Sequence, residues 1–138
     1  MGVLARTRIG REGRVYYFHP DHRNGNRNKS QWTVNRTAEF GIFIESEDRS
    51  WGDGSASYWG LLVREGRIEY LGTCVTGRQL NIAHFVSHNA QDWHGYPANP
   101  RRNTRDAPIE PVRRAWLSTG LITKAQANRL KRRLICSL

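Results

Sequence analysis

The chain has 138 residues, a net charge of +10 and a hydrophobic fraction of 38%. This length allows one ordinary domain with a real core, and no apolar run is long enough to cross a membrane, so we expect no membrane partner. We expect a single domain, 1–138, with a β-rich body at 1–97 and a basic helical part at 98–138. Two distant cysteines and the lack of a signal-like apolar stretch in residues 1–6 predict a cytoplasmic location.

The β-rich body begins with a short motif that recurs later in the chain. Residues 11–18 and 64–71 match at five of eight positions, and in both a Glu-Gly pair precedes β-branched and aromatic residues. Such a pair suits a tight turn, so we expect two similar hairpins, from shared turn chemistry or from a duplicated half-domain. Further strands are expected at 40–45, 58–64 and 78–85, with loops at 19–30 and 46–57. The body is therefore predicted to hold an antiparallel sheet of about five strands.

After four prolines between positions 97 and 111, the pattern becomes helical. Pro111 suits the first turn of a helix, and Gly120 can close its end in a left-handed conformation. Thr123 and Gln126 form a capping box for a second helix, which we expect to run to about Leu134. The fold class is thus predicted to be α+β: an antiparallel sheet of about five strands followed by a C-terminal two-helix hairpin.

Positive charge is concentrated at the C-terminal end. Residues 101–138 contain ten Lys or Arg against two acidic residues, whereas residues 1–100 contain twelve against ten. Most of these cations are Arg, whose guanidinium binds phosphate in a bidentate manner. We expect nucleic acid, RNA or DNA, bound mainly through its phosphate backbone; a solvated basic face is the alternative. The predicted contact residues are Arg101, Arg102, Arg105, Arg113, Arg114, Lys124, Arg129, Lys131, Arg132 and Arg133.

Three histidines, His84, His88 and His94, lie within eleven residues around a run of aromatic residues. Two imidazoles can cleave RNA without a metal, because one removes the proton of the ribose 2′-hydroxyl and the other protonates the leaving oxygen. Tyr96 or a neighbouring Arg would then stabilise the charge on phosphorus. The sequence therefore predicts, as an alternative to binding alone, a metal-independent ribonuclease of toxin type with these three histidines as catalytic residues.

Other interpretations of these residues stay open. His84 can be a core histidine with satisfied hydrogen bonds, residues 93–97 can form a structural corner, and the three histidines with Asp92 can form a zinc site. The loop that carries His19 and His22 is either an exposed connector or a segment that closes over a nucleic-acid backbone. A different class of function is a non-enzymatic adaptor or inhibitor that binds an acidic protein surface. Our expectation is that the chain uses no metal and no cofactor, since no phosphate-binding glycine loop or Cys-x-x-Cys pair is present.

Overall fold

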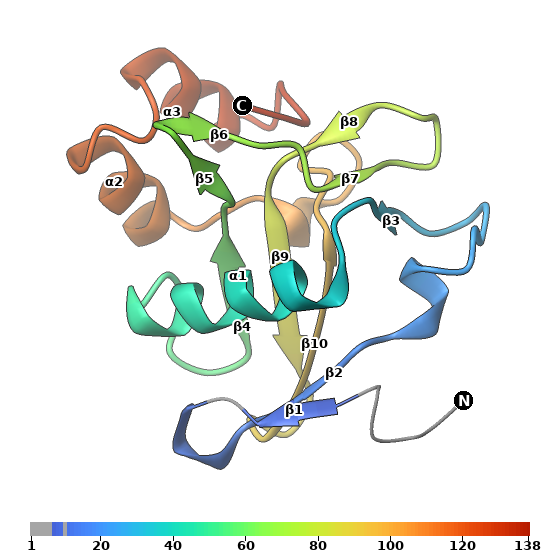
Figure 1. Cartoon of the computed structure of the whole chain (residues 1–138). Coiled ribbons are helices and arrows are strands. Elements are labelled where there is room, and N and C mark those ends of the chain that lie inside the picture. Colours follow the sequence, from blue (N-terminus) through green and yellow to red (C-terminus); the bar gives the residue numbers. More distant parts are fainter. Residues whose placement is uncertain (1–6, 10) are drawn as a thin grey trace.

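The computed structural model describes residues 7–9 and 11–138, so the opening residues used for the cytoplasmic prediction lie outside the described part. The elements fall into an α+β fold, as expected (Figure 1). The helices are η2 (Arg11–Gly13), η3 (Pro20–His22), α1 (Arg36–Asp48), η4 (Thr104–Asp106), α2 (Glu110–Ser118) and α3 (Lys124–Lys131), where η marks a 3₁₀ turn. The strands are β1 (Thr7–Ile9), β2 (Val15–Tyr17), β3 (Gln31–Trp32), β4 (Ser57–Gly60), β5 (Val63–Arg64), β6 (Arg67–Ile68), β7 (Gly72–Thr73), β8 (Gln79–Leu80), β9 (Ala83–Ser87) and β10 (Asp92–Pro97).

The main sheet has the strand order β1-β2-β10-β9-β4 and is mixed rather than antiparallel. Its one parallel pair among the described strands joins β2 to β10, with Val15 opposite Asp92 and Tyr16 opposite Trp93. Two smaller sheets, β3-β7-β8 and β5-β6, lie beside it. The expectation of one antiparallel sheet is therefore corrected: the described strands form three sheets, and the largest, of five strands, is mixed because β2 pairs in parallel with β10.

The prediction of a strand at residues 40–45 is wrong, since these residues lie inside α1. The helix starts where the side chain of Asn35 accepts a hydrogen bond from the Ala38 N–H at 2.8 Å. The buried residues of α1 are Glu39, Ile42, Phe43, Ser46 and Glu47, a spacing of three and four that places them on one helical face. Through this face α1 covers one side of the main sheet (Figure 1).

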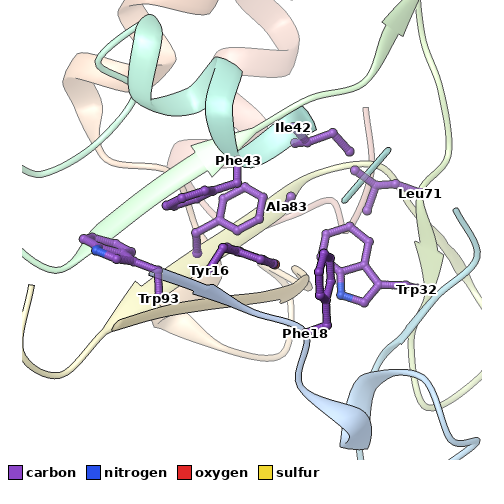
Figure 2. Packing of buried hydrophobic residues seen from close by; sticks show 9 residues of the cluster. Tyr16, Phe18, Trp32, Ile42, Phe43, Leu71, Ala83 and Trp93 are labelled. Atoms are coloured by element: carbon purple, nitrogen blue, oxygen red, sulfur yellow. The ribbon is translucent and has the colours of Figure 1, made fainter. Parts of the chain in front are cut away.

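An aromatic core fills the space between α1 and the sheet. Phe43 of α1 lies 4.8 Å from Tyr16 and 5.3 Å from Phe85 between ring centroids, and Trp93 lies in the same cluster (Figure 2). Gly95 belongs to the covered side too, since a Cβ there would sit 2.2 Å from Phe85 Cδ1. Successive side chains of a strand point to opposite faces, so the residues that alternate with these face away from α1.

Both predicted Glu-Gly hairpins are present. Glu12 and Gly13 have φ of 54° and 73° in the first, and Glu65 and Gly66 have φ of 52° and 76° in the second. In the second hairpin these two left-handed residues form the whole turn between Arg64 and Arg67, a two-residue turn that matches the twist of the strands, whereas in the first they lie within the longer connection between Ile9 and Val15. The first hairpin joins β1 to β2 and the second joins β5 to β6.

The C-terminal part contains the two expected helices, with one boundary shifted. Pro111 lies in the first turn of α2, and Thr123 and Gln126 form the capping box of α3. α3 ends at Lys131 instead of running to about Leu134. Arg133 has a φ of 55°, a left-handed conformation that cannot continue a right-handed helix. Trp116 of α2 and Leu130 of α3 are fully buried in a second core cluster, which fastens both helices to the body.

Candidate functional site

The face of the main sheet opposite α1 carries two rows of three paired residues, which are polar or aromatic except for one valine. In the strand register Tyr96 is opposite His84, which is opposite Trp59, and His94 is opposite Val86, which is opposite Ser57. These six residues, here called the open face, thus form two rows across β10, β9 and β4. The prediction that His84 lies in a strand is confirmed.

The loop before β3 brings two more histidines onto the open face. The His19 ring lies 5.4 Å from that of His94 and 5.6 Å from that of His22, measured between ring centroids. His22 stacks on Tyr96 at 5.2 Å, and its Nδ1 contacts the Ser30 carbonyl oxygen at 2.9 Å. The loop at 19–30 is therefore packed against the sheet through its histidines.

Three adjoining hollows open over this surface, and His94 lines all of them. The first, of about 430 Å³, is lined by His22, Lys29, Cys74, His94, Tyr96 and Arg102 among others. The second, of about 600 Å³, includes Ser57, Trp59, His84, His88, His94, Tyr96 and Arg105. The third, of about 340 Å³, includes Tyr17, His88, Asp92 and His94. All five histidines of the chain thus line these hollows or contact a residue that does.

His94 stands out electrostatically. Burial, followed by the charges of His19, His22, His88 and His84, lowers its pKa from 6.5 to about 4. At neutral pH its imidazole is therefore uncharged and can accept a proton. Burial lowers the pKa of His22 as well.

His84 is held in a buried hydrogen-bond network. Its side chain is 2% exposed and stacks on Trp59 at 4.8 Å with an interplanar angle of 5°. Its Nδ1 lies 2.8 Å from Tyr96 Oη, and its Nε2 lies 3.1 Å from Ser57 Oγ. Tyr96 donates to Asp106 Oδ1 at 2.6 Å, which together with burial raises the pKa of the phenol. Both ring nitrogens of this predicted catalytic residue are thus occupied, by side chains rather than by backbone.

His88 is exposed at the end of β9, at the border of the second and third hollows. It therefore lies near His94, whereas His84 lies deeper in the second hollow. The three predicted histidines share the second hollow, but only His88 and His94 are open to solvent to any extent.

The predicted basic residues separate into groups. Arg101, Arg102 and Arg105, here called the connector arginines, are exposed between β10 and α2, and two of them line the hollows. A second group, here called the α3 cations, lies on α3 or just after it: Lys124, Arg129, Lys131, Arg132 and Arg133. Neither group forms an ion pair with another residue of 7–9 or 11–138.

Arg113 and Arg114 are engaged locally. Arg113 donates to the Pro108 carbonyl oxygen at 2.6 Å, and Arg114 pairs with the exposed Glu110 four residues earlier on α2. Both line a fourth hollow of about 250 Å³ between α2 and α3. The single basic constellation predicted from the sequence is therefore divided, and only the connector arginines reach the histidine-lined hollows.

His19, His22 and Lys29 are not among the predicted site residues, although the loop that carries them is an alternative nucleic-acid contact in the sequence interpretation. The local signal was present, because two histidines flank a Pro-Asp pair in a basic loop. Their position beside His94 depends on the parallel pairing of β2 with β10. Because the loop begins just after β2, this pairing places its first residues alongside β10, the strand that carries His94.

The zinc interpretation of His84, His88, His94 and Asp92 is not supported by the geometry. Within residues 7–9 and 11–138 there is no group of three or more His, Cys, Asp or Glu side chains that could hold a metal ion.

No helix of the described chain has both the length and the apolar character of a bilayer span. Comparison of the chain with protein-family models, with curated proteins and with solved structures finds no match.

Proposed function

We propose that this protein binds nucleic acid through the phosphate backbone, which lies along the histidine-lined hollows beside the connector arginines. The observation that carries the proposal is the border of the hollows: Lys29 and Arg102 line the first, and Arg105 lines the second. None of these three exposed cations forms an ion pair within the described residues. Unpaired cations beside a concave surface attract a polyanion and release its counterions on binding.

The open face offers what a nucleic-acid backbone requires besides charge. The imidazole of His94 can supply a hydrogen bond where the hollows meet, and that of His88 can supply another at the border of the second and third hollows. The first two hollows share His94 and Tyr96, so they form a continuous concave surface rather than isolated cavities. The α3 cations lie on a separate element and provide a secondary contact.

The test compares two variants that remove the same charge. In one, Arg101, Arg102 and Arg105 are replaced by Gln; in the other, Arg129, Arg132 and Arg133 are replaced by Gln. Binding of a labelled single-stranded RNA and of the matching DNA is measured by fluorescence anisotropy between about 50 and 200 mM salt. We expect the connector variant to lower the slope of log K against log salt by about 2, because each single-strand phosphate contact contributes about 0.7.

The α3 variant should lower that slope by less than the connector variant. Equal slopes for the two variants would show that the contact is not at the hollows. Failure of the unaltered protein to bind either oligonucleotide at about 50 mM salt would refute nucleic-acid binding altogether.

A metal-independent ribonuclease is the second candidate, favoured by the position and the lowered pKa of His94. Its neutral imidazole lies where the three hollows meet and 5.4 Å from the ring of His19, so one ring can accept a proton while another donates one. Cleavage of a fluorescent RNA in chelator, with the corresponding DNA left intact, would support this activity. The variant His94→Gln should abolish cleavage while circular dichroism stays unchanged, and RNA that stays intact although it is bound would contradict it.

A further inference from the structure

We infer that Ser57 is an activated nucleophile, with His84 as its general base and Tyr96 and Asp106 as the groups that orient His84, and that it accepts the acyl group of a carboxylic ester. This activity goes beyond nucleic-acid binding. It uses Ser57 and the buried His84 in the second hollow, which Arg105, one of the three proposed phosphate contacts, also lines, whereas Lys29 and Arg102 line the first hollow.

The four side chains form a connected series. Ser57 Oγ lies 3.1 Å from His84 Nε2, His84 Nδ1 lies 2.8 Å from Tyr96 Oη, and Tyr96 Oη lies 2.6 Å from Asp106 Oδ1. Asp106 Oδ1 also lies 3.4 Å from His84 Nδ1 directly. A serine, a histidine and a carboxylate in hydrogen-bond order are the arrangement that activates serine for acyl transfer, on whatever fold it occurs.

The hydrogen bonds determine which nitrogen of His84 carries the proton. The ionised Asp106 can only accept, so the phenolic hydrogen of Tyr96 is donated to it. The phenolic oxygen is then left to accept a hydrogen bond from Nδ1–H of His84. Nε2 is therefore unprotonated and points its lone pair at the Ser57 hydroxyl, which is the tautomer that a general base requires.

The rigidity of the site favours this role over a mobile contact. His84 stacks flat on Trp59, and the second oxygen of Asp106 accepts the Asn99 N–H at 2.8 Å. Ser57 opens β4 directly after a turn in which Asp53 Oδ1 accepts the N–H groups of residues 55 to 57 at 2.9 to 3.0 Å. Tyr96 stacks on His22 at 5.2 Å, so each of the four partners is positioned by a contact outside the series and the geometry is fixed before a substrate binds.

The surroundings of Ser57 indicate the class of substrate. The second hollow has a volume of about 600 Å³, and Trp59, Val86 and Ile109 give it apolar walls suited to the hydrocarbon part of an ester. Arg105 lines the same hollow and supplies the positive charge that a developing oxyanion needs. A neutral ester with a small acyl group fits this combination.

The reaction balances without a metal or a redox partner. Ser57 Oγ forms a bond to the carbonyl carbon while its proton moves to His84 Nε2, and the tetrahedral intermediate then expels the alcohol, which takes that proton. Water attacks the acyl-serine, gives a proton to the same nitrogen, and releases the carboxylic acid as Ser57 regains its hydrogen. The Asp106 carboxylate stabilises the imidazolium that forms twice in this cycle.

The test is covalent labelling of the intact, unaltered protein with a fluorophosphonate probe, followed by peptide mass spectrometry. We expect one adduct, mapped to Ser57, formed with loss of fluoride. Ser57→Ala should abolish it, and His84→Gln should slow it by about 100-fold, the usual contribution of a general base. Ser55→Ala, an exposed serine two residues earlier, is the matched control and should label as the unaltered protein does.

Two results would overturn the proposal, and neither requires a variant to fold. One is the lack of any adduct on protein whose circular dichroism is native, and the other is an adduct mapped to a residue other than Ser57. Hydrolysis of p-nitrophenyl acetate, with an initial burst close to one equivalent of nitrophenol, supplies a second measurement. Because both assays lack nucleic acid, their outcome does not depend on whether the phosphate-binding proposal holds.

Discussion

Acidification should destabilise this protein through His94, and the effect can be isolated by one substitution. The pKa of His94 is about 4 in the folded protein and 6.5 for a free imidazole. The unfolded chain therefore binds more protons between these two values. The stability that His94 contributes is fully present above pH 6.5 and is lost as the pH falls through 4.

The magnitude follows from the size of the shift and the exposure of the ring. A shift from 6.5 to about 4 corresponds to at most about 3.4 kcal/mol, since each pKa unit is worth about 1.4 kcal/mol. His94 is only half-buried, and solvent screens its repulsion from the other histidines. We therefore expect the actual contribution to be about 1–2 kcal/mol.

Urea unfolding at about pH 7.5 and about pH 4.5 measures this contribution. On acidification, the free energy of unfolding of His94→Gln should fall by about 1–2 kcal/mol less than that of the unaltered protein, because the Gln amide does not bind a proton. His88→Gln removes an exposed imidazole whose charge contributes less than burial to the His94 shift, so its loss should lie between those of the unaltered protein and of His94→Gln. Identical losses for all three proteins, or an NMR titration of His94 near 6.5, would refute the reasoning.

Two further predictions concern stability. Arg23 donates two hydrogen bonds to Oε1 of the buried Glu39, from Nη2 at 2.7 Å and from Nε at 3.0 Å. Arg23→Met should therefore cost about 3 kcal/mol in urea unfolding, because the buried carboxylate loses its ion-pair partner. Adding Glu39→Gln should restore part of that loss, and a cost below about 1 kcal/mol for the single variant would contradict the interpretation. Gly95→Ala should cost about 3 kcal/mol, because its Cβ would overlap the ring of Phe85 at 2.2 Å. The matched variant Gly41→Ala, which meets no atom within 4 Å, should be neutral or stabilising by up to about 1 kcal/mol, and equal melting temperatures for the two would disprove the steric argument.

The parts of the fold that follow from local signals were predictable. The Glu-Gly turns, the proline of α2 and the capping box of α3 act within a few residues, and each is present in the structure. α1 was misassigned because its buried face includes Glu39, Ser46 and Glu47 as well as apolar residues. Hydrophobic periodicity cannot reveal a helix whose buried face is more than half polar. The ion pairs that partner the buried carboxylates join Glu39 to Arg23 and Glu47 to Arg14, both of which precede α1 in the chain.

The candidate site was predictable only in part, for a related reason. His84, His88 and His94 are close in sequence, so their clustering indicated a site directly. Ser57 gave no comparable signal, because a serine becomes a candidate nucleophile only when a histidine lies beside it. That neighbour is supplied by the pairing of β4 with β9, which strand patterns alone do not specify.

The parallel pairing of β2 with β10 has a consequence for biosynthesis. β2 emerges early from the ribosome, yet its inner neighbour in the main sheet is completed only at Pro97. Until then the aromatic residues around Tyr16 lack their neighbouring strand. The entropy lost in bringing β2 and β10 together is compensated only when the contacts between them form. The aromatic residues around Tyr16 therefore lack their sheet neighbour until residue 97 has been synthesised, and a chaperone that recognises exposed aromatic segments would find its target there.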